Sequence, residues 1–128
     1  MPSVAFSTGT TNDWLGWRAA VHAPAGQETW ARLSAVACSI LDEISADGTL
    51  DAADVVNVNL PEGSDMDTER RRTTVAPTGY GSIFAPNGDG RFSHAYDGIL
   101  VPRGVMDGTD VEAAHDGAIS ITALNLSG

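Results

Sequence analysis

The region from Gln27 to Ile44 constrains the fold most, because its apolar residues recur with the period of an α-helix. They fall at Trp30, Leu33, Val36, Ala37, Ile40, Leu41 and Ile44. The spacing i, i+3, i+4, i+7 places them on one side of a helix, where they can cover a sheet. Glu28 suits the positive end of the helix dipole in the first turn, and Gly48 predicts the point where the helix stops.

Short apolar runs before and after this helix predict two strands. Residues 2–8 (PSVAFST) predict a short buried strand, and residues 55–60 (VVNVNL) predict a second one, which Pro61 ends. Residues 12–26 are rich in turn-forming residues, so we expect a turn-rich segment there. A strand, a helix and a strand over residues 1–61 favour the α/β class.

The second predicted strand has an apolar face, with Val56, Val58 and Leu60, and a polar face that carries Asn57 and Asn59. Asparagine is depleted in strands and costly to bury without a partner. Two interpretations stay open. The amides hydrogen-bond the backbone of loops at the strand end, or they face a ligand crevice beyond the carboxyl ends of the strands.

Residues 62–103 form a second region with a different character. Residues 62–72 are charged and lack an apolar face, which predicts a loop. Asn87-Gly88 lies between two apolar arms and predicts a β-hairpin with a type I′ turn. Pro77 and Gly79 interrupt the first arm, so we expect a long, bent ribbon.

The arms of this ribbon carry more apolar surface than an isolated hairpin can bury. Phe84, Phe92 and Tyr96 are the aromatic residues that we expect to anchor a contact between copies of the chain. The alternative is that the ribbon folds back over its own sheet. We therefore expect a homo-oligomer, a dimer or higher.

Residues 104–128 form the last region, a loop followed by a strand. Residues 110–114 predict a short helical turn within the loop. In residues 118–124, Ile119 and Ile121 alternate with Ser120 and Thr122, which predicts the final strand. We see no internal repeat, so the three regions are expected to make one partial domain.

Individual reactive side chains do not make an active site by themselves. His22, His94 and His115 lack ligand spacing, so surface or hydrogen-bonded positions are expected; the adjacent pair His115-Asp116 could orient an imidazole. Cys38 lies on the predicted helix and is expected to pack rather than react. The triplet Arg70–Arg72 either clamps a phosphate or forms a solvated loop that balances its acidic neighbours.

The net charge of −10 argues against nucleic acid or an anionic membrane surface as the main partner. A single cysteine excludes an internal disulfide and fits a reducing compartment. The first 20 residues lack a signal-peptide pattern, and no stretch of 18 apolar residues occurs. We expect a cytoplasmic protein.

Three segments together resemble the SurE family, the survival-protein nucleotide phosphatases. Residues 55–61 (VVNVNLP), with Asn57, Asn59 and Pro61, resemble the family's strand-and-proline motif, and PSVAFST resembles the strand that precedes it. GTDVEAAHDGAISITAL resembles the family's ending, with matches that include Thr109, Asp110, Ser120 and Thr122 and with alanine in place of the usual proline. The order and the intervals fit over nearly the whole chain.

The resemblance implies the C-terminal half of a SurE-like, Rossmann-like fold with a protruding β-hairpin. It implies a parent that hydrolyses 5′- or 3′-nucleoside monophosphates with Mg²⁺ or Mn²⁺, to which this half supplies scaffold and oligomer interface. The family's metal ligands come from an N-D-D-G loop and two later loops, and Asn12-Asp13-Trp14 does not reproduce that pattern.

We therefore expect no metal ligand and no catalytic residue in this chain. It should hold no cofactor of its own and meet a nucleotide substrate only with the missing half. Whether the chain is part of an enzyme stays open at this point. The alternatives are a stand-alone oligomerisation module without catalysis and a small binding domain unrelated in function.

Overall fold

The computed structural model of the chain describes residues 1–8, 14–80, 84–94, 100–102 and 104–126. They divide into two compact units, one made of residues 1–75 and 108–128 and the other of residues 76–107. Each unit is described by itself.

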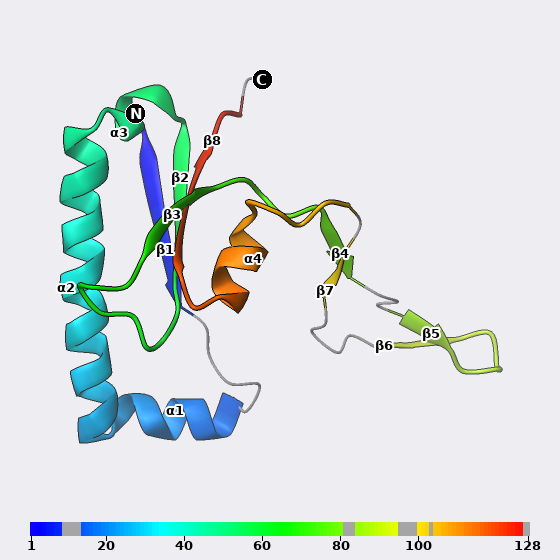
Figure 1. The fold of residues 1–128 in the computed structure, drawn as a ribbon. Coiled ribbons are helices and arrows are strands. Elements are labelled where there is room, and N and C mark those ends of the chain that lie inside the picture. The colour runs from blue at the N-terminus through cyan, green and yellow to red at the C-terminus, as the bar shows by residue number, and fades with distance from the viewer. Residues whose placement is uncertain (9–13, 81–83, 95–99, 103, 127–128) are drawn as a thin grey trace. The chain divides into compact units, whose positions relative to one another are not determined.

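The first unit is an α/β layer built on a four-stranded mixed sheet (Figure 1). Its strands are β1 (Ser3–Thr8), β2 (Val55–Leu60), β3 (Arg70–Thr73) and β8 (Ile119–Leu124), in the order β1-β2-β8-β3. β1 runs parallel to β2, β2 runs antiparallel to β8, and β3 runs parallel to β8. The predicted α/β class is confirmed.

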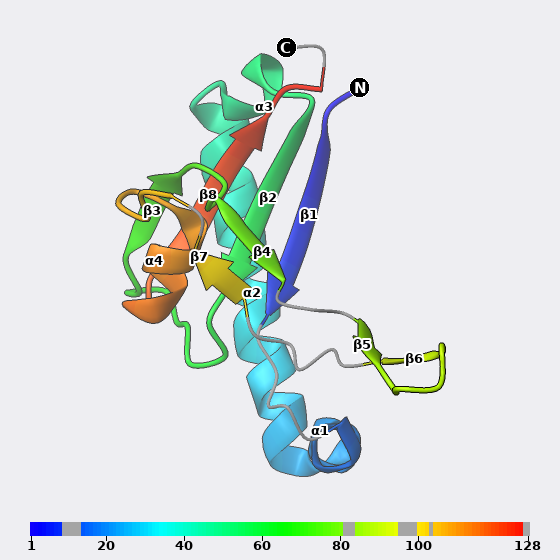
Figure 2. The same cartoon turned by 90° about the vertical axis from the view of Figure 1, so that its right-hand side faces the viewer.

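Helices α1 (Trp14–His22), α2 (Pro24–Ala46), α3 (Thr49–Ala52) and α4 (Asp110–His115) complete the unit. Figures 1 and 2 show α2 along one face of the sheet and α4 beside β8 on the opposite side. α2 follows directly on α1, because Pro24 fits the first turn of a helix but not its interior.

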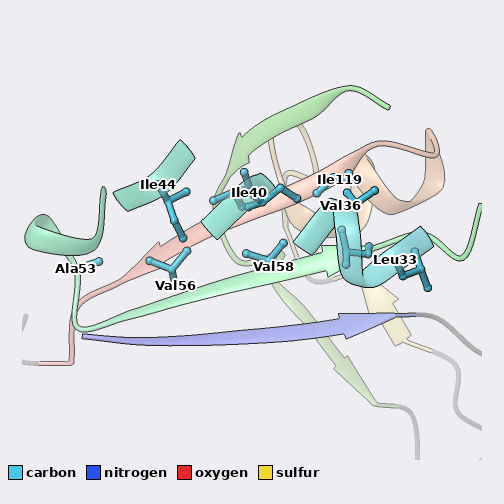
Figure 3. Packing of buried hydrophobic residues seen from close by; sticks show 10 residues of the cluster. Leu33, Val36, Ile40, Ile44, Ala53, Val56, Val58 and Ile119 are labelled. Carbon is cyan, nitrogen blue, oxygen red and sulfur yellow. The ribbon is translucent and has the colours of Figure 1, made fainter. Parts of the chain in front are cut away.

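The core lies between α2 and the sheet, as Figure 3 shows. Its buried members are Leu33, Val36, Ile40, Ile44, Ala53, Val56, Val58, Leu60, Ile119 and Ile121. On α2 they follow the predicted helical spacing, and on β2 the predicted alternation, so both patterns are confirmed. Trp30 and Leu41 belong to the same sequence pattern but are 36% and 39% exposed, at the margins of the buried stripe.

The end of α2 is confirmed at Gly48, which has a φ of +85° just after the C-cap Asp47. Glycine adopts this conformation without a steric penalty from a Cβ atom. The prediction for Glu28 is wrong, because α2 begins at Pro24 and its first turn contains no acidic residue.

Three segments of the first unit form elements that the sequence did not predict, and one of them is α3. Residues 14–22 form α1 where a turn-rich segment was expected, since several good helix formers outweigh the single Gly16. Residues 70–73 form β3 where a loop was expected, because pairing with β8 satisfies their backbone groups.

Burial differs from prediction on the first and last strands. β1 was expected to be buried, yet only Val4 and Thr8 are partly covered, because β1 lies at an edge of the sheet. β8 is flanked by strands on both sides, and residues 119–122 are all buried, Ser120 and Thr122 included. The final strand itself is confirmed, and so is the helical turn predicted at residues 110–114, which forms α4 and extends to His115.

The second unit consists of two short antiparallel pairs. β4 (Thr78–Tyr80) pairs with β7 (Leu100–Pro102), and β5 (Phe84–Pro86) pairs with β6 (Phe92–His94). The hairpin predicted around residues 87–88 is confirmed, but its turn is not type I′. Five residues connect the strands, with positive φ only at Gly88 and Gly90, and the Asn87 N–H donates to the Arg91 carbonyl over 2.9 Å.

Candidate functional site

The face of the sheet that carries the asparagines is polar across all four strands. The pairing register aligns Ser7 with Asn59, Asn59 with Ser120 and Ser120 with Arg71. We call these four residues the polar row. The adjacent register positions are Ala5, Asn57, Thr122 and Thr73. Two motifs far apart in the sequence, residues 55–61 and 108–124, therefore lie side by side on neighbouring strands.

Hydrogen bonds within this face run between strands. The Ser7 hydroxyl donates to the Asn59 side-chain oxygen, and the hydroxyls of Thr73 and Thr122 lie 2.7 Å apart. This bond of Asn59 reaches a side chain on β1, which neither sequence interpretation foresaw. Ser120 is 1% exposed, and its hydroxyl has no hydrogen-bond partner among the described residues.

The arginine triplet is divided between the two faces of the sheet, because successive side chains of a strand alternate. Arg70 and Arg72 reach α2, where Arg70 Nε lies 3.1 Å from the Glu43 carboxylate and Arg72 pairs with Asp47 over 2.5 Å. The Arg70 contact is an ion pair without the geometry of a directed hydrogen bond. Three cations that diverge and are already paired do not form a phosphate clamp.

Arg71 points to the opposite face, where its guanidinium donates to Glu69 over 3.1 Å and to Asp116 over 2.8 Å. These hydrogen bonds, with Glu69 the larger cause, raise the pKa of Arg71 and keep it charged. The carboxylate of Asp116 therefore bonds Arg71, where the sequence suggested that it could orient the imidazole of His115.

Thr109 and Asp110 start α4. Thr109 is the N-cap, and its hydroxyl accepts from the Glu112 N–H over 3.2 Å. Backbone bonds around it join the loop to residue 74, since the Thr74 N–H donates to Gly108 and the Asp110 N–H donates to the Thr74 carbonyl. The Thr-Asp pair thus fixes the start of a helix that packs beside β8.

Side-chain hydrogen bonds join α2 to the loop after β2, a contact that the sequence did not reveal. Pro61 begins this loop, and its carbonyl accepts from the Ser64 N–H over 2.9 Å. The guanidinium of Arg32 donates to the carbonyls of Ser64 and Glu62 over 3.0 and 2.7 Å. An arginine on the exposed side of a helix gives no sequence signal for such a role.

The described residues do not fit a divalent-metal site. Within the ranges that the structure describes, no group of three or more His, Cys, Asp or Glu is placed to hold a metal ion. Several carboxylates are instead paired with arginine, namely those of Glu43, Asp47, Glu69 and Asp116. His22 and His115 are exposed in different helices. Cys38 is exposed too, so the prediction that it packs is wrong.

A hollow of about 230 Å³ lies between β1 and α2. Its lining is Phe6, Ser7, Thr8, Trp30, Leu33, Ser34, Ala37 and Leu60.

The predicted interface residues lie in the second unit. Phe92 is 69% exposed on β6, and Phe84 is on β5, where its backbone pairs with His94. Tyr96 lies outside the described residues. Their role as anchors stays a prediction.

No protein-family model and no curated protein sequence matches the chain. Among solved structures, the chain is similar to the SurE protein from Aquifex aeolicus, with a TM-score of 0.54 and 18% sequence identity. The chain has the fold of part of a SurE protein. The match covers 98% of this chain and 46% of that chain, so this chain spans less than half the length of that SurE protein.

The similarity to SurE predicted from the three sequence motifs is thus confirmed for the fold. At 18% identity it shows the fold alone. Two of the segments that resemble SurE, residues 2–8 and 55–61, form neighbouring parallel strands, and the third forms α4 and β8. No helix in the described part of the chain is long and apolar enough to cross a membrane.

Proposed function

We propose that this chain is the C-terminal, scaffold-forming portion of a SurE-like nucleoside monophosphate phosphatase that depends on Mg²⁺ or Mn²⁺. The observation that supports this proposal is the fold similarity, which covers 98% of this chain but only 46% of the SurE chain. The sequence order of the three motifs supports the assignment to the C-terminal half.

In this proposal the chain contributes no metal ligand and no catalytic group. The absence of a metal-binding cluster among the described residues supports that division of roles. The ion pairs of β3 and the hydrogen bond of the polar row hold the sheet in place as a scaffold. The other portion of the phosphatase then supplies the carboxylates that a hard divalent cation needs.

We also propose that the hairpin of β5 and β6 protrudes and forms the main contact of a cytoplasmic homo-oligomer. The exposure of Phe92 supports this, because a large aromatic side chain in water favours association. The net charge of −10 opposes nucleic-acid or membrane partners.

The second candidate is an oligomerisation module without catalysis. It is favoured by the complete pairing of Arg70–Arg72 with carboxylates, which leaves no cationic triplet for a phosphate. Reading the genomic sequence upstream of Met1 separates the candidates. An in-frame segment with N-D-D-G favours the phosphatase, and its absence favours the module.

The biochemical test measures phosphate release from a panel of nucleoside monophosphates with Mn²⁺ or Mg²⁺. We expect no turnover by the 128-residue chain, and EDTA-sensitive turnover by the chain joined to such an upstream segment. Replacing the N-D-D-G aspartates with asparagine is the matched control and should abolish turnover. EDTA-sensitive hydrolysis by the chain alone would contradict the proposal and direct attention to Asp110, His115 and Asp116.

A further inference from the structure

The loop between β5 and β6 contains Asn87-Gly88, the one place in the sequence where glycine follows an asparagine. Elsewhere asparagine precedes aspartate, valine or leucine. The backbone nitrogen of the following residue can reach the side-chain carbonyl carbon of an asparagine and close a five-membered ring. A side chain on that following residue obstructs the approach, and glycine, which has no Cβ atom, removes the obstruction.

The structure leaves the attacking nitrogen accessible. Asn87 and Gly88 are exposed, and apart from its chain neighbours nothing lies within 4 Å of the position that a Cβ atom of Gly88 would take. The Asn87 N–H donates to the Arg91 carbonyl over 2.9 Å, whereas the Gly88 N–H has no hydrogen-bond partner among the described residues. The bond that closes the loop therefore holds the nitrogen of Asn87 and not that of Gly88.

A side chain from β6 contacts the amide that would be attacked. The Ser93 hydroxyl donates to Oδ1 of Asn87, and the pairing of Ser93 with Ala85 holds the serine beside the loop. When a nitrogen adds to the side-chain carbon, Oδ1 gains negative charge, and a hydrogen bond to an oxygen that gains charge becomes stronger. The fold thus supplies a stabilising contact that the same dipeptide lacks in an unfolded chain.

We propose that Asn87 is a modification site, at which the backbone of the chain itself converts the side-chain amide into a carboxylate. The Gly88 nitrogen gives its proton to the solvent and bonds Cγ of Asn87, the bond from Cγ to the side-chain nitrogen breaks, and ammonia leaves with a proton from the solvent. Water then adds to either carbonyl of the cyclic imide and breaks its bond to the ring nitrogen. The products are aspartate and isoaspartate, and the net reaction consumes one water and releases one ammonia.

Either product changes the tip of the hairpin. A carboxylate at residue 87 lies two positions from Asp89, so two negative charges replace one in the loop. In isoaspartate the main chain runs through the side-chain carbon atoms, which lengthens the loop by one atom. Ion exchange should therefore separate the modified chain as a more acidic species. The inference rests on this loop alone and does not depend on the proposed phosphatase role.

The test follows the full chain by mass spectrometry during incubation in mildly alkaline and mildly acidic buffers. Trypsin releases residues 73–91, whose one asparagine is Asn87, and residues 33–70, which contain Asn57 and Asn59 as the internal reference. The mass of the first peptide should rise, faster in alkaline buffer because the attacking nitrogen must lose a proton, and that of the second should stay constant. An unchanged first peptide, or an equal rise in both, overturns the proposal.

Variants test the parts of the loop. Asn87→Gln should stop the mass change, because glutamine would have to close a six-membered ring. Ser93→Ala should slow it about threefold in the folded chain and should not alter it in urea, where β5 and β6 do not pair. Ser93→Thr keeps the hydroxyl and should keep the rate, and Ser120→Ala, a hydroxyl removed from the other unit, is the matched control. Equal rates for the wild type and Ser93→Ala in the folded chain overturn the role of the fold.

Fragmentation of the modified peptide gives an independent readout. A cyclic imide predicts both aspartate and isoaspartate at residue 87, since water can open either carbonyl. Direct hydrolysis of the side-chain amide gives aspartate alone. A mixture of the two products supports the proposal, and aspartate alone overturns it.

Discussion

Asn59 on β2 lies directly opposite Ser120 on β8 in the antiparallel register of the sheet. The first accepts a hydrogen bond from Ser7, and the second has a buried hydroxyl without a partner among the described residues. Burying a hydroxyl without a hydrogen bond costs free energy, whereas a bonded pair contributes about 0.5–1.5 kcal/mol. Neighbouring positions of one polar face therefore differ in what they contribute to stability.

Replacing Thr122 with valine should lower the free energy of unfolding by about 0.5–1.5 kcal/mol, because the hydroxyl of Thr73 loses its partner. Ser120→Ala is the matched control on the same buried strand and should change it by less than about 0.5 kcal/mol. Urea denaturation followed by circular dichroism measures both. A loss at Ser120→Ala as large as at Thr122→Val would mean that the Ser120 hydroxyl is hydrogen-bonded.

Asp47 should make the stability of the fold depend on acidity. Hydrogen bonds from the Thr49 side chain and N–H, and then the charge of Arg72, hold the pKa of the Asp47 carboxyl below its ordinary value of 3.8. Since the pKa is lower in the folded chain than in the unfolded one, the ionised carboxylate stabilises the fold above that ordinary value. Its contribution is lost as the pH falls through the lowered value.

Thermal melts of the wild type and of Asp47→Asn at a series of pH values check this. The wild type should melt higher at about pH 7, and the difference should shrink as the pH falls below about 4. Asp42→Asn, an exposed substitution on the same helix, controls for the loss of one negative charge. A difference that grows toward acid pH would contradict the assignment.

Gly26 should not tolerate alanine. A Cβ atom at this position of α2 would overlap the carbonyl oxygen of Ala20 on α1. Glycine to alanine inside a helix normally stabilises by about 0.5–1 kcal/mol, but here the overlap should destabilise by about 1–3 kcal/mol. Gly63→Ala, where the added atom meets nothing within 4 Å, is the control. Denaturant unfolding of both variants measures the sign; a stabilised Gly26→Ala would show that α1 and α2 do not pack as described.

The double substitution Phe84→Ser and Phe92→Ser should convert an oligomer into a folded but less stable monomer. The reason is that Phe84 and Phe92, on paired strands, are two of the three residues that we propose as anchors of the oligomer contact. Light scattering gives the mass, and circular dichroism shows whether the chain is folded. Val105→Ser, a position that is 76% exposed outside that hairpin, is the control and should keep the oligomeric mass. An unchanged mass, or unfolding, would place the hairpin in the protomer's own core.

The sequence by itself determined the elements that depend on local periodicity. The apolar stripe of α2 and the alternation of β2 identify the faces that meet in the core, because helix and strand periods dictate which side chains share a face. Gly48 marks the end of α2 for an equally local reason, the backbone conformation that the stop requires. The similarity to SurE could also be predicted, since its motifs lie in order along the chain.

Only the tertiary structure decided which strand is central and which lies at an edge. PSVAFST and AISITAL have similar apolar content, yet β1 is largely exposed and β8 is buried on both faces, because strand order depends on pairing between distant segments. The same holds for Arg70–Arg72. Their charges suggest a solvated loop, but β8 supplies backbone partners, and α2 and residue 116 supply carboxylates on opposite faces. These partners are brought together only when the chain folds, so no local pattern could reveal them.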